Sequence, residues 1–132
     1  MDVTVDTSVV IAVIANEPEK QRLIRMTEGA DLIAPHSVHW EIGNAFSAML
    51  KRGRIEMEQA AKAIEAYRQI CIRFVDVELH KALDIADELG IYAHDAYLVR
   101  CAVKYGTALM SLDRGLVEAA RQMGVDGMEA RR

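Results

Sequence analysis

The sequence predicts a single α/β domain with a mostly parallel sheet and helices on both of its faces. Three observations support this class: short apolar runs alternate with longer helical stretches, glycines stand where several helices should end, and the chain has 132 residues. A chain of this length can bury about two thirds of the surface that its unfolded form exposes, so one core suffices. No linker or low-complexity stretch divides it, and we expect one domain over residues 1–132.

The predicted strands and helices alternate along the whole chain. Strands are short β-branched or apolar runs bounded by turn residues, and we place them at 2–6, 31–34, 72–77, 108–110 and 125–130. Helices show apolar residues every three or four positions, and we place them from about residue 7, over 16–29, 37–53, 56–70, 78–89, 93–104 and 112–123. In the second helix, Asn16 or Glu17 should be the cap and Pro18 should lie in the first turn.

Composition and charge narrow the classes of protein that the chain can be. Hydrophobic residues make up 52% and charged residues 27%, which is typical of a globular domain. The 16 Lys and Arg against 20 Asp and Glu leave a net charge of −4, so no overall basic field attracts nucleic acid. Any such contact must be local. The one dense basic run, residues 51–54, fits a solvated helix end or a phosphate contact.

Two features indicate the cellular compartment. The longest apolar run, residues 9–15, is far shorter than the roughly 20 residues of a membrane span, and Asp2 and Asp6 stand where a signal peptide would be basic. We therefore expect a cytoplasmic protein without membrane contact. Cys71 and Cys101 lack CxxC spacing, so we expect two free, buried thiols without a chemical role.

Four acidic residues occupy positions where a carboxylate is unexpected. Asp6 stands between two apolar runs, and Glu41 borders the apolar face of its helix. Asp95 shares a helical stripe with apolar residues, and Asp113 follows directly on an apolar strand. In open α/β sheets, sites form beyond the carboxyl ends of the strands, near the point where the strand order reverses. We therefore expect the four carboxylates to converge on one cleft.

Each of these acids also has a purely structural interpretation. Asp6, Asp95 and Asp113 all fall near helix N-termini, where a carboxylate caps free N–H groups and suits the helix dipole. Glu41 lies inside its helix and could be a glutamate that extends toward solvent. The residues alone leave capping and site chemistry both open.

A cation would explain why four carboxylates share a cleft. Like charges this close raise one another's pKa or move apart unless a cation is bound. Oxygen ligands without CxxC or HExxH favour Mg²⁺ or Mn²⁺, which suits phosphodiester hydrolysis by a metal-activated water. Four polar side chains beside the acids could orient ligands or water: Thr7, Ser8, Asn44 and Ser111. Thr7, Ser8 and Ser111 are also ordinary helix caps.

Four short motifs resemble one known family. They are "VDTSVV" with Asp6, "WEIGNAF" with Glu41 and Asn44, "HDAYLVRCA" with Asp95, and "SLDRGL" with Asp113 behind Ser111. In this order and spacing the chain resembles the PIN-domain ribonucleases, and among them the toxins of bacterial and archaeal VapBC toxin–antitoxin modules. The resemblance spans nearly the whole chain. The family often has Thr where this chain has Ser111, which exchanges one hydroxyl for another.

The resemblance implies a fold, an activity and partners. The fold is a PIN-like three-layer sandwich around a five-stranded parallel sheet. The activity is that of a Mg²⁺- or Mn²⁺-dependent endoribonuclease, in which Asp6, Glu41, Asp95 and Asp113 bind the metal and carry catalysis. The partners are the RNA substrate, a second copy of the chain, and a small antitoxin whose C-terminal segment enters the acidic cleft.

Aromatic residues on helical surfaces also favour a homodimer, because such residues are common anchors at interfaces; they are Trp40, Tyr67, Tyr92 and Tyr97. For Trp40, packing in the core is the alternative.

Other functions remain to be weighed. A PIN-fold module that only binds RNA or protein would have lost an acid, and none is missing. A haloacid-dehalogenase-like phosphatase needs a second Asp where Ser8 stands, and a response-regulator receiver could use only Asp6 and Asp76. A zinc site could use His36, His39 and Glu41, which are close in sequence, but no further His or Cys completes it.

Overall fold

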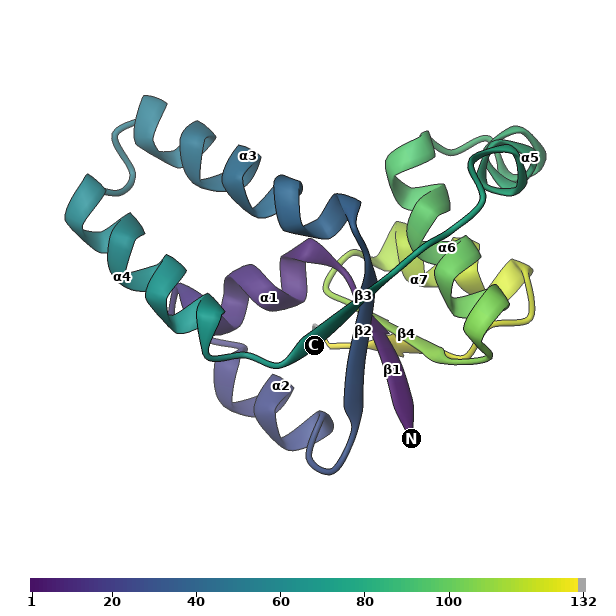
Figure 1. The fold of residues 1–132 in the computed structure, drawn as a ribbon, viewed down its shortest axis with the longest axis horizontal. Helices are drawn as coiled ribbons and strands as arrows, with labels where there is room; N and C mark the ends of the chain where they lie inside the picture. Colours follow the sequence, from purple (N-terminus) through teal and green to yellow (C-terminus); the bar gives the residue numbers. More distant parts are fainter. Residues whose placement is uncertain (131–132) are drawn as a thin grey trace.

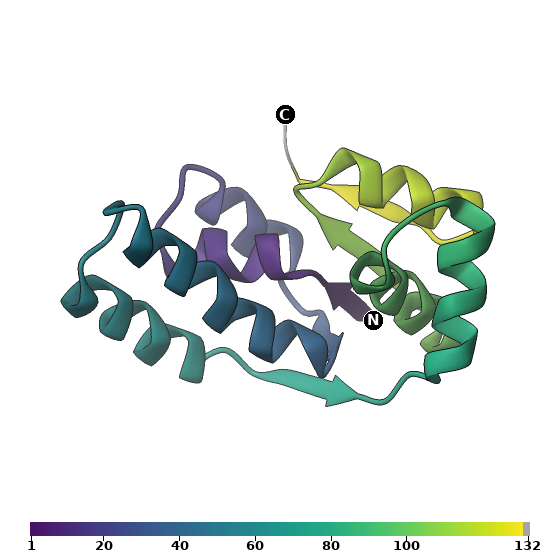
Figure 2. The same ribbon diagram turned by 90° about the horizontal axis from the view of Figure 1, so that it is seen from above.

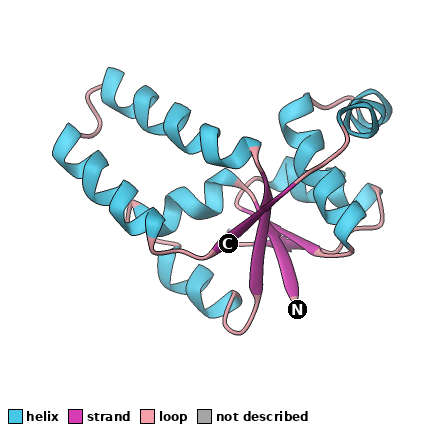
Figure 3. Cartoon of the chain, viewed as in Figure 1, coloured by secondary structure: helices cyan, strands magenta, loops and turns pink. Residues whose placement is uncertain are grey.

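A computed structural model describes residues 1–130, and the alternation of strands and helices runs through this whole range (Figure 1, Figure 3). The strands are β1 (Asp2–Val5), β2 (Asp31–Pro35), β3 (Ile72–Val75), β4 (Ala108–Ser111) and β5 (Gly127–Glu129). The helices are α1 (Thr7–Ile14), α2 (Lys20–Met26), α3 (Ser37–Lys51), α4 (Met57–Arg68), α5 (Leu79–Leu89), α6 (Ala93–Tyr105) and α7 (Arg114–Gln122). Within the same range, no helix has the length and apolar character that crossing a membrane requires. The predicted α/β class is confirmed.

The five strands form one sheet in the order β3-β2-β1-β4-β5, and every neighbouring pair is parallel. The predicted mostly parallel sheet is thus parallel throughout. Helices α1 to α4 lie on one side of the sheet and α5 to α7 on the other, with α4 packed against α1 and α5 against α6, as the two views at right angles show (Figure 1, Figure 2). The chain runs outward from β1 to β3 and then returns to β4, so the strand order reverses between β1 and β4. In such sheets this is where ligands bind.

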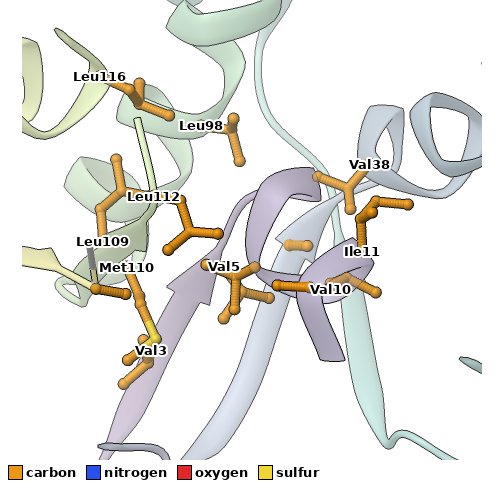
Figure 4. Packing of buried hydrophobic residues seen from close by; sticks show 14 of the residues in the cluster. Val3, Val5, Val10, Ile11, Val38, Leu98, Leu109, Met110, Leu112 and Leu116 are labelled. Atoms are coloured by element: carbon orange, nitrogen blue, oxygen red, sulfur yellow. The ribbon is translucent and has the colours of Figure 1, made fainter. Parts of the chain in front are cut away.

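The core fixes the two central strands. The side chains of Val3 and Val5 in β1 and of Leu109 and Met110 in β4 are fully buried. They join one apolar cluster with the buried residues of α1 and α6 (Figure 4). Burying one such side chain contributes about 1.5–3 kcal/mol to folding. The carboxyl ends of β1 and β4 therefore start from a rigid base.

Several predicted helix ends are confirmed. Gly90 and Gly106 follow α5 and α6 with φ of 67° and 65°, the left-handed conformation that glycine adopts without steric cost. Asp6 and Asp113 are the N-caps of α1 and α7, and each carboxylate accepts backbone N–H groups from the first turn.

The second helix begins later than we predicted. Asn16 takes a left-handed φ of 55°, and its Oδ1 accepts a hydrogen bond of 2.7 Å from Lys20 Nζ. The chain thus turns after α1, Pro18 lies in this turn, and α2 starts only at Lys20. Asn tolerates the left-handed conformation because its short polar side chain can hydrogen-bond locally.

One prediction about a single side chain is wrong, the burial of Cys71, and the alternative placement of Trp40 in the core is ruled out. Cys71 is exposed, although Cys101 is buried as expected, with Sγ 3.5 Å from Thr4 Oγ1; both thiols are free. Cys71 lies in the turn before edge strand β3, where only β2 pairs alongside and no further strand covers it. Trp40 is 71% exposed, which rules out its packing in the core.

Gly127→Ala should destabilise the domain. A Cβ at position 127 would lie 2.6 Å from Val117 Cγ1 and 3.1 Å from the backbone oxygen of Val117, which is buried in α7. Strand β5 would have to move away from α7, and overpacking of this kind costs about 1–3 kcal/mol.

Gly43→Ala is the matched control, because no atom lies within 4 Å of a Cβ at this position in α3 and Ala is favoured over Gly in helices by about 1 kcal/mol. Urea unfolding of both variants measures the difference. Equal effects on the free energy of unfolding would show that β5 does not pack against α7 as described.

Candidate active site

Asp6 lies where β1 ends, beside the end of β4. Val5 pairs with Met110 in the parallel ladder, so the next residues along the two strands, Asp6 and Ser111, are neighbours. The backbone N–H of Asp6 donates to Met110 O at 3.3 Å and continues this pairing. Asp6 is only 5% exposed. A charge so deeply buried needs polar partners.

Two serine hydroxyls hold the Asp6 carboxylate, one at each oxygen. Ser111 Oγ donates to Asp6 Oδ2 at 2.6 Å, and Ser8 Oγ donates to Asp6 Oδ1 at 2.6 Å. The backbone N–H of Val9 also donates to Oδ1 at 3.2 Å, which is the N-cap bond of α1. We call Ser8 and Ser111 the serine pair. Their hydrogen bonds fix the orientation of the carboxylate about its own axis.

The serine pair also ties Asp6 to the turn between β4 and α7. Ser111 Oγ accepts from the backbone N–H of Asp113 at 2.8 Å, and Ser8 Oγ accepts from the backbone N–H of Leu112 at 3.2 Å. The first contact is a local turn that spacing can predict. The second joins residues 104 positions apart. Sequence analysis missed it because it depends on β1 and β4 being neighbours.

Burial and charge set the protonation of Asp6. Burial raises its pKa above the usual value and outweighs the hydrogen bonds from Ser111, Ser8 and the Val9 N–H, which lower it. The negative charge of Asp113 raises the pKa further. Asp6 is therefore a carboxylate whose ionised form would gain from a nearby cation.

Asp113 and Asp95 lie within electrostatic reach of this group. Asp113 is exposed, and its Oδ1 accepts from the N–H groups of Gly115 at 2.9 Å and Leu116 at 3.4 Å. Asp95 is half-buried in the first turn of α6; burial is the main cause of its raised pKa, and the charge of Asp113 adds to it. Asp113 thus acts on both other acids.

Capping does not account for Asp95. The N-cap of α6 is Tyr92, and among residues 1–130 no hydrogen bond to the Asp95 carboxylate is found. We call Asp6, Asp95 and Asp113 the acidic group. Asp6 and Asp113, by contrast with Asp95, are N-caps as well as members of this group. Capping therefore explains two of these three acids, and Asp95 retains only the interaction of a first-turn carboxylate with the helix dipole.

Glu41 stands somewhat apart. It lies one turn into α3, which leaves the sheet at the carboxyl end of β2, and it is half-buried. Asn44 Nδ2 donates to Glu41 Oε1 at 3.0 Å, so the predicted pairing of these two residues is present. In the described part of the chain, no three His, Cys, Asp or Glu side chains are already close enough to hold a metal ion. The convergence of all four carboxylates stays a prediction.

Thr7 and Arg114 complete the surroundings of the acids. Thr7 Oγ1 is buried directly after Asp6 and has no hydrogen-bond partner among residues 1–130. Arg114 Nε donates to Glu129 Oε1 at 2.6 Å, which holds this arginine on the β5 side of the group.

The histidines near Glu41, His36 and His39, contact polar side chains outside the acidic group. His39 Nδ1 is 2.8 Å from Tyr67 Oη, and His36 Nε2 is 3.2 Å from Asp76 Oδ1. Each imidazole therefore has its own polar partner.

Family comparison agrees with this geometry. A family model described as "PIN domain" matches residues 3–122. The chain belongs to the PIN-domain family. PIN domains are generally nucleases, so the acidic group at the ends of β1 and β4 lies in a fold associated with phosphodiester hydrolysis. Among curated proteins, none matches the chain.

Solved structures show the same fold. PAE2754 from Pyrobaculum aerophilum is 23% identical over 96% of this chain and 89% of its own, with a TM-score of 0.74. VapBC2 from Rickettsia felis, solved bound to a DNA fragment from its promoter, is 13% identical over 98% of both chains, with a TM-score of 0.68. FitAcB from Neisseria gonorrhoeae is 17% identical over 97% of both chains, with a TM-score of 0.58. At these identities the likeness establishes the fold.

Asp95→Asn should leave the metal-free PIN domain as stable at pH 7 or make it more stable. The pKa of Asp95 is raised in the folded state, so its ionised form is disfavoured there. A carboxyl group whose pKa is raised in the folded state contributes most to the free energy of unfolding below its unfolded-state pKa of about 3.9. This contribution is lost as the pH rises through the folded-state pKa. The advantage of the variant should therefore shrink as the pH falls toward 4.

Urea unfolding in EDTA at pH 7 and pH 4 measures this. Asp84→Asn, at an exposed position of α5, is the control and should show no such pH dependence. A loss of about 1 kcal/mol by Asp95→Asn at pH 7, as removal of a helix cap would produce, would contradict the electrostatic account.

Proposed function

We propose that this PIN domain is a metal-dependent endoribonuclease that hydrolyses RNA phosphodiester bonds. The single observation that carries the proposal is the buried Asp6 carboxylate, held at both oxygens by the serine pair and under the charge of Asp113. A fold needs no second carboxylate near a buried one, because like charges oppose ionisation. A bound catalytic cation would offset the repulsion between these carboxylates.

The residues present fit Mg²⁺ or Mn²⁺. The acidic group offers oxygen donors, which hard cations prefer, and Mg²⁺ usually keeps several waters and takes only one or two protein carboxylates. One or two of the carboxylates of Asp6, Asp95 and Asp113 would bind the ion directly, and the remaining acids, with Glu41, would contact it through its waters. When bound, the ion would polarise a phosphoryl oxygen and lower the pKa of an attacking water.

The other side chains act by position. The serine pair holds Asp6 in one orientation, so its free lone pairs keep a constant direction. Asn44 donates to Glu41 and fixes that carboxylate on α3, from which it could accept a proton from water. Thr7 stands directly after Asp6, with its hydroxyl buried and without a hydrogen-bond partner among residues 1–130.

We further propose that the protein is the VapC-type toxin of a toxin–antitoxin pair in the cytoplasm, inhibited by a small antitoxin protein. Support comes from the motif order and from the fold shared with VapBC2. A homodimer is part of this proposal. Trp40 and Tyr92 are 71% and 87% exposed, and large exposed aromatic side chains of this kind anchor interfaces. The alternative is a catalytically inactive PIN-fold module that binds RNA or protein.

Cleavage of RNA tests the activity. The purified protein should cut single-stranded RNA with Mg²⁺ or Mn²⁺ and stop when EDTA removes the ion, because the acids need the cation to act together. Asp6→Asn and Asp95→Asn should each lower the rate by roughly 100-fold or more, the scale on which a catalytic group contributes.

Asp84→Asn is again the control and should cut normally. Gel analysis of a labelled RNA gives the rates. Cleavage that persists in EDTA would move the chemistry to other residues. No cleavage by wild type with either ion, together with RNA binding, would favour the inactive module.

A further inference from the structure

A small cavity opens at the carboxyl ends of β2 and β3, at the start of the helix that carries Glu41. Its volume is about 190 Å³, and it is lined by residues 35–37, residues 75–77 and Tyr97. Figure 1 shows the start of α3 and the connection from β3 to α5 at the same end of the sheet. Ser37 lies one turn before Glu41 on the same face of α3, and Tyr97 lines the cavity from α6, the helix that carries Asp95 in its first turn. A molecule bound at the acids could therefore extend into this cavity.

One lining residue has an unsatisfied hydrogen-bonding group. Ser37 Oγ is buried and has no hydrogen-bond partner among residues 1–130. Buried polar atoms in folded proteins are almost always hydrogen-bonded, and an exception points to a water, ion or ligand. Ser37 as a whole is half-buried and lines the cavity, so a rotation of its side chain about the Cα–Cβ bond can present the hydroxyl to a ligand there.

The remaining walls combine flat rings with a polar edge. His36 stacks on Phe74 with ring centroids 6.1 Å apart and an interplanar angle of 24°, which fixes the plane of the imidazole. His36 Nε2 also contacts Asp76 Oδ1 at 3.2 Å. Tyr97 adds a half-buried phenol from α6. Aromatic faces with hydrogen-bonding groups at their rim are how proteins hold an unpaired nucleobase.

We propose that this cavity binds one unpaired nucleobase of the RNA, adjacent to the phosphate that is cut. This rests on the proposed ribonuclease function for its biological meaning. The base lies against Tyr97 and His36, and its edge takes the hydrogen bond that Ser37 Oγ lacks. The site then selects single-stranded RNA, because a base paired in a duplex cannot enter.

Ser37→Ala separates binding from folding. The variant removes an unsatisfied buried hydroxyl, so its melting temperature should not fall. Because one neutral hydrogen bond to the base is lost, KM for RNA should rise about 2- to 10-fold with kcat little changed. Ser47→Ala is the matched control, since Ser47 is exposed on the same helix and donates to Asn44 O. A KM equal to that of wild type would overturn the proposal.

Tyr97→Leu tests the stacking surface while keeping an apolar side chain. Its affinity for RNA should fall about 5- to 150-fold, the range found when a base loses its aromatic partner. Circular dichroism establishes that the variant is folded. Unchanged affinity of the folded variant would contradict stacking.

A metal-free titration keeps this proposal distinct from the ribonuclease activity. In EDTA, each of the four ribonucleoside 5′-monophosphates is titrated into ¹⁵N-labelled protein, with ribose 5-phosphate as the probe without a base. At least one nucleotide should shift the amide signals of residues 36–37 and 75–77, and ribose 5-phosphate should not. Equal shifts with ribose 5-phosphate, or none with any nucleotide, would overturn the base site. Cleavage plays no part in this readout, so the absence of ribonuclease activity would leave its result standing.

Discussion

The hydrogen bonds of Ser8 and Ser111 to Asp6 are the interaction on which the rest of the site depends. Removing a carboxylate from water costs several kcal/mol, and each hydrogen bond to a charged group returns about 1.5–3 kcal/mol. Three donors reach Asp6, yet its pKa is still raised, so burial remains the larger effect. The carboxylate is held firmly and is still short of positive charge. A bound cation would supply the missing positive charge, which is why this condition supports the proposed metal site.

The same two hydroxyls connect elements that are distant in sequence. Through Leu112 and Asp113 they bind the turn after β4 to the end of β1, so Asp113 is brought toward Asp6 by the pairing of the central strands. Helix α6 packs on the opposite face from α1 and supplies Asp95 from its first turn. The strand order therefore brings the acidic group together. The cavity at the carboxyl ends of β2 and β3 lies at the same end of the sheet and is lined in part by Tyr97.

Local patterns were enough to predict the elements and several of their ends. Alternating apolar runs, the glycines after α5 and α6, and the cap positions of Asp6 and Asp113 all depend on neighbours in sequence. Strand order does not depend on neighbours in sequence. Only the strand order brings Ser111 Oγ close to Asp6 and the Leu112 N–H close to Ser8. The late start of α2 depends on the left-handed conformation of Asn16. The exposure of Cys71 depends on the position of β3 at the edge of the sheet. Hydrophobic periodicity encodes neither feature.

Direct measurement of metal binding tests the central claim, that the Asp6 group holds a divalent cation. Mn²⁺ is titrated into wild type, Asp6→Asn and Asp84→Asn, and free Mn²⁺ is followed by electron paramagnetic resonance. Wild type and Asp84→Asn should bind the ion alike, and Asp6→Asn should bind at least about tenfold more weakly, because a ligand is lost from a site that its neighbours fix. Folded Asp6→Asn that binds Mn²⁺ as tightly as wild type would contradict the account.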